Sequence, residues 1–392
     1  MKFKIVLLFF PIILFQIGCA STNLQPITNG NFQLETDEKG IWHQMEEEQK
    51  ALNRSGVLYT DKELDEYLNE IARKLYSENV PAQIAFNIHV IKDRQFNAFA
   101  SPNGHIYINT GILACMENEA QLATLLAHEM THVTHRHAVK RFRDVKNKTA
   151  FLATLNVTLG GAGGGLVSLL GTFGTLASVS GYSRELETEA DIEGFKLIKK
   201  AGYDPIESVV FFNLLKREIE EEEIKQPFFF GTHPRVQERI ENFEDLIKSD
   251  DRKASNGLKN TDQFLIKTLK VRMDNAFLDL KAGRFKKARR ATDRYKELKP
   301  NDAKVYYLLG EIENQERGDI GLERAIDNYK KAISIDSSCP EPYREIGLIY
   351  FKQKDKRRAI EFLEQYLYLS KETADKAYVE EYLKQCKEGD KP

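Results

Sequence analysis

The chain has 392 residues, which is long enough for two or three domains with hydrophobic cores of their own. Its 57 basic and 59 acidic side chains give a formal net charge of −2. This mixed balance argues against nucleic acid as a partner, because nucleic-acid-binding domains concentrate basic residues on one face.

The N-terminus has the layout of an export signal. Two lysines precede an almost wholly apolar run over residues 5–17, which is short for a membrane span. Gly18 and Cys19 follow, and this ending resembles a bacterial lipoprotein signal, in which the cysteine becomes the lipidated first residue. We therefore expect a signal peptide over 1–18 and export to the periplasm. Ala20, in place of an aspartate, favours the outer membrane as the anchor. An uncleaved anchor or an ordinary secretory signal is the alternative.

Residues 19–41 are expected to be the lipid anchor and a tether, because most of them are polar or form turns. Residues 42–249 are predicted to be one α+β domain, whose first part mixes helical and strand-like periodicity. The predicted elements are helices at about 42–54 and 61–78 and short strands at 85–91, 97–100 and 105–109. His89 and His105 fall in these strands, and we interpret both as ordinary sheet residues.

One long helix over 117–141 is predicted next, and it carries the pattern His128-Glu129-x-x-His132. Positions i and i+4 share a helix face, so both imidazoles can reach one metal ion. Glu129 then lies beside that metal, where a general base for a bound water is needed. His135 and His137 are expected to continue the helix, with His135 at the surface or behind a ligand.

Residues 149–183 form a run of 35 residues without a charged side chain and with five glycines over 160–165. Hydropathy alone permits a membrane span. However, a single crossing would separate the residues before and after it that we expect to meet at one metal. Two helices packed against the core are therefore the favoured interpretation, and a glycine-hinged lid or a hairpin touching the bilayer are the alternatives.

A third metal ligand is expected from the helix that begins near residue 183. Zinc in hydrolases usually takes three protein ligands and leaves one position for water. Glu187 and Asp191 are four positions apart and share a helix face. Glu187 as the ligand, with Asp191 holding a ligating imidazole, is chemically sensible. Charge and spacing alone leave three other candidates, namely Glu185, Glu189 and Glu193.

The last 130 residues differ in character from the rest. A polar linker over 250–262 precedes a region, 263–392, that is helical and repetitive. Tyr306-Tyr-Leu-Leu-Gly310 aligns with Tyr343-Arg-Glu-Ile-Gly347, and an earlier copy places Gly283 and Ala288 at matching offsets. Such spacing of small and large residues is typical of tetratricopeptide repeats. We predict an α-solenoid of about three repeats and a terminal helix, and hence a mainly α chain.

The cysteines say little about function. Export would permit a disulfide, and Cys339 with Cys386 is the one pair within a single predicted domain. The sequence leaves open whether that bond forms. Cys115 is interpreted as a buried thiol of the core.

Several separated motifs together resemble the zinc metallopeptidases of the HtpX/Ste24 type. They are His128-Glu129-x-x-His132, Ser183-Arg184-x-x-Glu187-x-x-Ala190-Asp191, Thr232-His233-Pro234 with Arg239 beyond it, and the segments 97–100 and 109–111. With an exported N-terminus and C-terminal repeats, the resemblance is to the BepA-like members of this family. It runs from about residue 45 to the end.

The resemblance implies one zinc ion per chain, held by His128, His132 and Glu187. Glu129 would take a proton from the zinc-bound water and return it to the leaving amine of the cleaved peptide bond. An exposed strand near 105–109 is expected to hold the extended substrate by β-addition.

Three more residues are assigned to the active site by the same resemblance. Asp191 would support a ligating imidazole. His233 and Arg239 would lie in a loop near the site. There, His233 would either cap the metal as a fourth ligand at rest or stabilise the oxyanion, and the sequence does not distinguish these roles.

The expected function is a zinc-dependent endopeptidase of the bacterial envelope that hydrolyses misfolded or stalled envelope proteins. The repeats would dock substrates or the outer-membrane assembly machinery, and Cys19 would bind the membrane. The alternative is a chaperone or interaction protein of outer-membrane assembly whose protease site rests, latched by His233.

Overall fold

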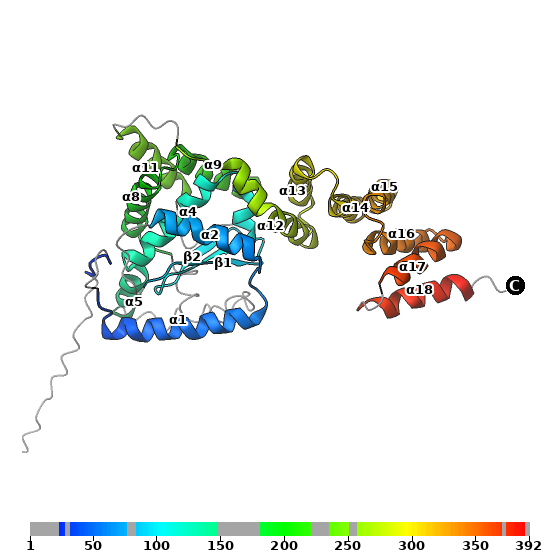
Figure 1. Ribbon diagram of the computed structural model, residues 1–392, viewed down its shortest axis with the longest axis horizontal. Coiled ribbons are helices and arrows are strands. Elements are labelled where there is room, and N and C mark those ends of the chain that lie inside the picture. Colours follow the sequence, from blue (N-terminus) through cyan, green and yellow to red (C-terminus); the bar gives the residue numbers. More distant parts are fainter. Residues whose placement is uncertain are drawn as a thin grey trace, which may run out of the picture.

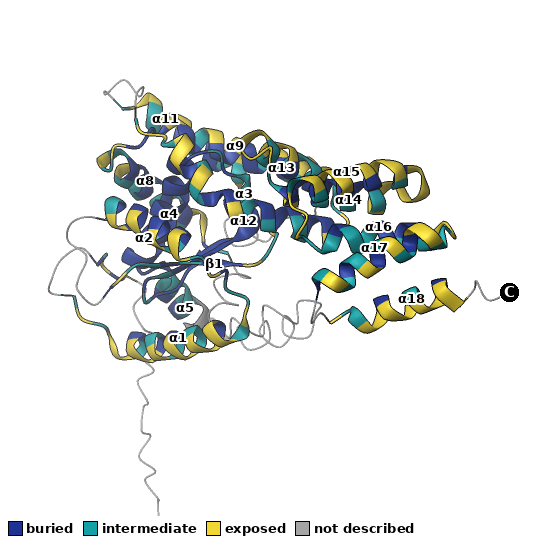
Figure 2. Cartoon of the chain, turned by 45° about the vertical axis from the view of Figure 1, so that its right-hand side comes forward, coloured by how far each residue is buried: buried dark blue, intermediate teal, exposed yellow. Residues whose placement is uncertain are grey.

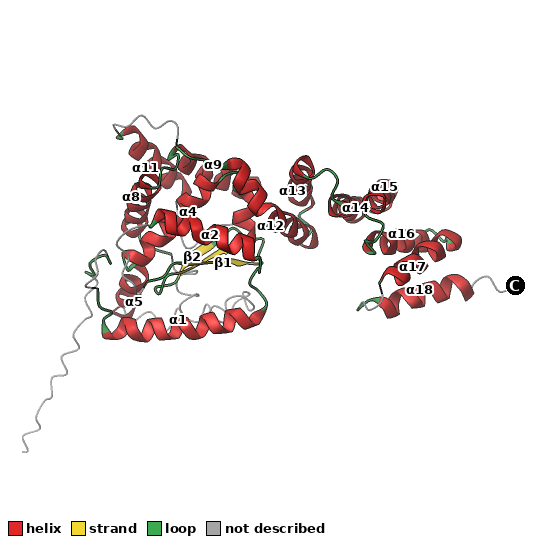
Figure 3. Cartoon of the chain, viewed as in Figure 1, coloured by secondary structure: helices red, strands yellow, loops and turns green. Residues whose placement is uncertain are grey.

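The computed structural model describes residues 23–27, 32–76, 84–147, 181–221, 235–250, 257–370 and 374–388. The chain is mainly α, as predicted, with one small sheet (Figure 3). Helices surround the sheet in the first part of the chain, and a row of paired helices leads away to the C-terminus (Figure 1). The predictions for the signal peptide, Cys19, residues 150–180 and His233 lie outside the described residues.

Two helices open the fold, and local capping sets their ends. Helix α1 (Thr36–Ser55) begins with a reciprocal capping box between Glu35 and Glu38 and therefore starts earlier than predicted. Helix α2 (Lys62–Leu75) begins at Asp61, whose side chain accepts a hydrogen bond from the backbone of Leu64. The apolar stripe of α2 packs into the main core.

The sheet has three strands: β1 (Asn87–Ile91), β2 (Ala98–Ala100) and β3 (His105–Asn109). Their order is β1-β3-β2, with β1 parallel and β2 antiparallel to β3. The expectation that the strand at 105–109 is exposed for β-addition is therefore wrong, because both edges of β3 are paired. In the described part of the chain, β1 and β2 are the outer strands, and a bridge between Leu58 and Ile91 covers part of the outer edge of β1, whereas no such bridge covers β2.

The predicted long helix over 117–141 is two helices. After the short α3 (Thr110–Cys115), α4 runs from Glu119 to Thr134 and α5 from His137 to Asn147. Between them Arg136 adopts a left-handed backbone conformation with φ of 56°. No glycine marks this break, so local sequence gives no signal for it. Every residue of α4 is buried, and the helix runs through the centre of the domain (Figure 2).

Helices α8 (Arg184–Lys200), α9 (Ile206–Glu221) and α11 (Val236–Lys248) complete this part of the core. Ser183 caps α8 by accepting a hydrogen bond from the backbone of Leu186. Gly194 lets α8 lie close to α4, since a Cβ atom there would lie 3.3 Å from the backbone nitrogen of His128.

The C-terminal part of the predicted linker is packed against the first domain. Leu258 pairs with Tyr203 as an isolated bridge, and the Asn260 side chain donates a hydrogen bond to Glu119. Helix α12 (Thr261–Lys281) follows at once. Phe264 at its start belongs to the main core, whereas Met273 belongs to the core of the repeats. Helix α12 is therefore shared by both parts of the chain.

The predicted repeats are present as three helix pairs and a terminal helix. The helices are α12 with α13 (Phe285–Leu298), α14 (Ala303–Arg317) with α15 (Leu322–Ile335), α16 (Glu341–Lys352) with α17 (Lys356–Leu369), and α18 (Lys376–Glu388). Gly310 and Gly347 lie where paired helices cross closely, against Tyr329 and Leu363. Gly283 does not match them, because it lies in the turn after α12 with φ of 73°.

Two further predictions concern the cysteines and the membrane. In the described structure no disulfide joins Cys339 and Cys386. Cys115 packs partly buried against the main core, and burial raises its thiol pKa to about 12. None of the helices in the described ranges is long and apolar enough to cross a membrane.

Candidate metal centre

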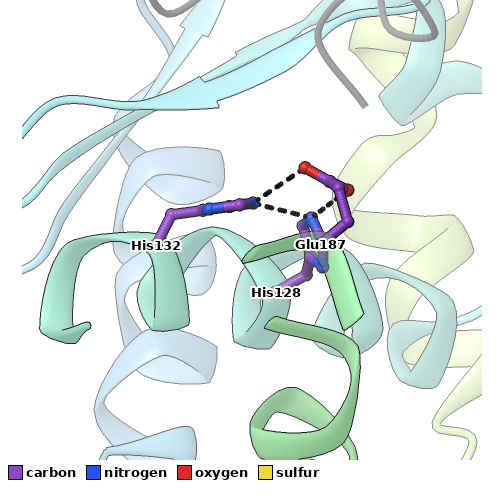
Figure 4. A group of neighbouring side chains, drawn as sticks. All are labelled: His128, His132 and Glu187. Carbon is purple, nitrogen blue, oxygen red and sulfur yellow. Dashed lines mark hydrogen bonds and ion pairs between the residues drawn. The ribbon is translucent and has the colours of Figure 1, made fainter. Parts of the chain in front are cut away.

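The three predicted ligands meet at one point. His128 and His132 project from α4, and Glu187 projects from the first turns of α8 (Figure 4). The Nε2 atoms of the two histidines are 2.9 Å apart. Glu187 places its carboxylate oxygens 3.4 Å from His128 Nε2 and 3.5 Å from His132 Nε2. Among the described residues, this is the one cluster of His, Cys, Asp or Glu side chains with the geometry of a metal site.

The donor set fits zinc. Two imidazoles and one carboxylate are a common ligand set of catalytic zinc, which leaves the fourth position for water. Zinc–ligand bonds of about 2.0–2.1 Å at tetrahedral angles place ligand atoms about 3.3 Å apart. The separations here lie close to that value, and all three side chains are buried. One zinc ion therefore fits among the three side chains with little rearrangement.

His128 is held from behind by an ion pair. Its Nδ1 lies 3.0 Å from Asp191 Oδ1 and 2.8 Å from an Arg239 nitrogen. Arg239 also donates to both carboxylate oxygens of Asp191, at 2.6 to 3.2 Å. Both charged side chains are almost wholly buried. Asp191 thus lies against His128, where the prediction needs it, whereas Arg239 lies within α11 and binds Asp191, not in a loop as expected.

His132 is held differently, by a second imidazole. The Nδ1 atoms of His132 and His137 are 2.8 Å apart, and Nε2 of His137 lies 3.0 Å from Glu189 Oε2. The Tyr182 ring stacks on the His132 ring with centroids 4.0 Å apart. Burial lowers the pKa of His137 to about 2, so this imidazole stays neutral.

Glu129 follows His128 directly on α4 and is also buried. Burial and the nearby charges of Glu129 and Glu187 raise the pKa of Tyr182. The predicted base thus lies in the same buried region as the ligands. Of the alternative third ligands, Glu189 binds His137 and Glu193 pairs with Lys196.

The sequence missed two contributors to the centre. The importance of His137 was hidden because a continuous helix would have turned it away from His132. Tyr182 lies at the end of the uncharged run, and no periodic pattern in that run predicts its contact with His132. The position of His137 directly after a cluster of histidines was the one available hint.

Comparisons with known proteins agree with this geometry. A model of peptidase family M48 matches residues 59–247, and a TPR repeat model matches residues 321–354. The Beta-barrel assembly-enhancing protease of Escherichia coli (strain K12) is 26% identical over 197 residues, which cover 49% of this chain and 40% of that protein. Mitochondrial metalloendopeptidase OMA1 of Schizosaccharomyces pombe is 30% identical over 183 residues, which cover 46% of this chain and 52% of that protein. The chain thus spans about half or less of these relatives' lengths.

Proposed function

We propose that the chain is a zinc-dependent endopeptidase, from the premise that its residues 59–247 belong to peptidase family M48. The observation that carries the proposal is the buried cluster of His128, His132 and Glu187, with Glu129 next to the first ligand. A buried set of this kind has no evident structural purpose without a metal. The relatives named above are also described as proteases or metalloendopeptidases.

The chemistry assigns a separate task to each side chain. Zinc, when bound, lowers the pKa of a water ligand toward about 7 and polarises the scissile carbonyl. Glu129 would accept a proton from a water held at the metal position and would deliver it to the leaving amine. Asp191 accepts the N–H of His128 Nδ1, and Arg239 holds the Asp191 carboxylate, so that Nε2 of His128 faces the metal position. The buried surroundings keep bulk water away from these charges.

The substrate is proposed to be an extended segment of an unfolded or misassembled envelope protein. Strand β2 is in contact with α4, the helix that carries His128 and His132. Because β2 pairs on one side only in the described chain, its other edge can hold a peptide backbone by strand addition. The repeats would dock substrates or a partner of the outer-membrane assembly machinery, and Cys19 would anchor the exported chain in the outer membrane.

Glu129→Gln tests the proposed chemistry. This variant is expected to bind one zinc ion per chain with wild-type affinity and to lose at least a hundredfold in hydrolysis of an unfolded protein, because it keeps the ligands and lacks the base. His128→Ala is expected to lose the zinc as well, as shown by elemental analysis. Wild-type protein that binds no zinc, or Glu129→Gln that cleaves at the wild-type rate, would overturn the proposal. The inactive variant also serves to trap bound envelope proteins for identification.

A further inference from the structure

We propose that His137 and Glu189 are positioning residues that hold the metal ligand His132 from behind. The inference deepens the proposed function and rests on its metal site, but it concerns zinc affinity and not the hydrolytic step alone. It assigns a role to His137 and Glu189, which the spacing of the motifs does not explain. Neither residue touches the metal position itself, because both lie on the far side of the His132 ring.

The proton positions in this chain of contacts follow from the ligand geometry. His132 faces the other ligands through Nε2, so that atom must be unprotonated to bind a metal. Its one ring proton is then on Nδ1 and is donated to Nδ1 of His137, 2.8 Å away. His137 must therefore carry its own proton on Nε2, which faces Glu189 Oε2 at 3.0 Å. The three side chains thus select one tautomer of each imidazole.

The break between α4 and α5 is what makes this contact possible. His137 is five positions after His132. On a regular helix it would point about 140° away from His132 around the axis. The left-handed conformation of Arg136, with φ of 56°, turns the chain back, and His137 becomes wholly buried beside His132.

The break is held by contacts from the N-terminal part of the chain. Arg136 donates two hydrogen bonds to the buried carboxylate of Glu38 on α1. Ile27 donates its backbone N–H to Thr134 at 2.7 Å, at the end of α4. A left-handed conformation is costly for a non-glycine residue, so these contacts are needed to maintain it. They fix the path of the chain that delivers His137 to the ligand.

The two histidine ligands are consequently supported by different chemistry. His128 is backed by the charged pair of Asp191 and Arg239, whereas His132 is backed by the imidazole of His137. Glu189 is the last side chain in the series of hydrogen bonds behind His132. It is about two-fifths exposed and also lies 3.7 Å from Lys140. If His137 is removed, the N–H of His132 loses its acceptor. If Glu189 is removed, His137 loses the acceptor that keeps its own proton on Nε2. Such outer partners typically contribute 10- to 100-fold to metal affinity.

The test measures zinc affinity by competition with a chromophoric chelator, using the full chain. His137→Leu is expected to weaken zinc binding by about 10- to 100-fold. His137→Asn is expected to recover part of that loss, because its Oδ1 atom takes the place of the accepting nitrogen. The matched control is His135→Ala, whose ring lies next to His137 but contacts Thr134, and it is expected to keep wild-type affinity.

Glu189→Ala is the second variant, chosen because this side chain is partly exposed and its removal spares the buried core. It is expected to weaken zinc binding severalfold and, at saturating zinc, to lower kcat for an unfolded substrate with KM unchanged. Folded His137→Leu and Glu189→Ala proteins with wild-type zinc affinity would overturn the inference. Wild-type protein that binds zinc without hydrolysing peptides would instead refute the proposed function and leave the affinity comparison valid.

Discussion

At the residue scale, the metal centre depends on buried charges that neutralise one another. Asp191 and Arg239 are both within 2% of complete burial, and the guanidinium binds the carboxylate through two nitrogens. A buried ion pair contributes little net stability, but removing one partner leaves the other charge buried and unpaired. The pair therefore matters less as a source of stability than as a fixed support for His128.

Arg239→Leu is expected to destabilise the protein by about 3–5 kcal/mol, because Asp191 is left charged and unpaired. Zinc affinity is expected to fall as well, since Asp191 would no longer hold the His128 ring in place. Thermal unfolding and chelator competition measure the two effects. Adding Asp191→Asn to Arg239→Leu is expected to recover part of the stability and none of the zinc affinity. Equal stability of Arg239→Leu and wild type would contradict this account of the pair.

The sequence predicted the ligands better than their supports. His128 and His132 follow from their spacing along one helix, and helical spacing is a local property. The choice of Glu187 over its acidic neighbours came from the family resemblance, not from charge or spacing. The bond between Arg239 and Asp191 joins residues 48 positions apart, and nothing local specifies it.

At the element scale, the centre requires α4 and α8 to lie close together. Gly194 is the residue of α8 at their closest approach, where a Cβ atom would lie 3.3 to 3.5 Å from the backbone of Ala127 and His128. A branched side chain there would push the helices apart and move Glu187 away from the two histidines. Helix packing distance thus controls ligand geometry directly.

Gly194→Val is expected to lower the unfolding midpoint and to weaken zinc binding at least tenfold, because overpacking separates the helices. Gly194→Ala is expected to be nearly neutral, since the gain in helix propensity offsets a small displacement. The matched control is Gly202→Ala, at a left-handed position after α8 with φ of 79°. It should cost stability without changing zinc affinity. If both glycine positions affect zinc binding equally, close packing at Gly194 is not the cause.

The boundaries of elements were predictable only where local chemistry sets them. The caps of α2, α4 and α8 lie close to their predicted positions, because Asp61, Asn118 and Ser183 act through their own side chains. The break at Arg136 depends on Glu38, which is 98 positions away in the sequence. The central place of β3 likewise depends on pairing with β1 and β2, which hydrophobic alternation does not specify.

Helix α12 also carries a buried carboxyl whose charge should affect stability. Burial raises the pKa of Asp279 to about 7, although Asn275 and Arg284 lie within 3.2 Å of its oxygens. In the unfolded chain its pKa is close to 3.8, so the folded protein binds the extra proton between about pH 4 and 7. The stability associated with the neutral form is present below pH 4 and is lost as the pH rises through 7.

Asp279→Asn is therefore expected to become more stable relative to wild type as the pH rises from 5 to 8. The unfolding midpoint of Asp279→Asn minus that of wild type should rise by roughly a few degrees between pH 5 and pH 8. Arg284 stays charged throughout this range and attracts Asp279 only once that carboxyl is ionised, an effect that the pKa of Asp279 already includes. Differential scanning calorimetry at the two pH values checks the result, and a difference that is independent of pH would show that Asp279 does not titrate as inferred.

At the scale of the whole molecule, the peptidase and repeat parts share α12. Its first half contributes Phe264 and Val271 to the main core, and its second half contributes Met273 and Leu280 to the core of the repeats. Arg272 donates hydrogen bonds to the backbone of α3 and the turn after it. We therefore propose that the functional boundary lies after α12, although the composition of the sequence places a linker at 250–262. Polar composition identified residues 250–262 as a linker, but it did not show that the C-terminal part of this linker packs against the peptidase part.

This shared helix predicts how the chain responds to truncation. A chain ending at residue 262 lacks Phe264 and Val271, two wholly buried side chains. Each is worth about 1.5–3 kcal/mol, and the loss of all of α12 also exposes their partners. Because the net stability of a domain is only about 5–15 kcal/mol, this chain is expected not to fold or bind zinc. A chain ending at residue 301 keeps α12 and α13 and is expected to bind zinc and to cleave a short peptide at nearly the full-length rate. Circular dichroism, zinc content and peptide hydrolysis distinguish the two chains. A folded, zinc-binding chain ending at 262 would show that α12 belongs to the repeats alone.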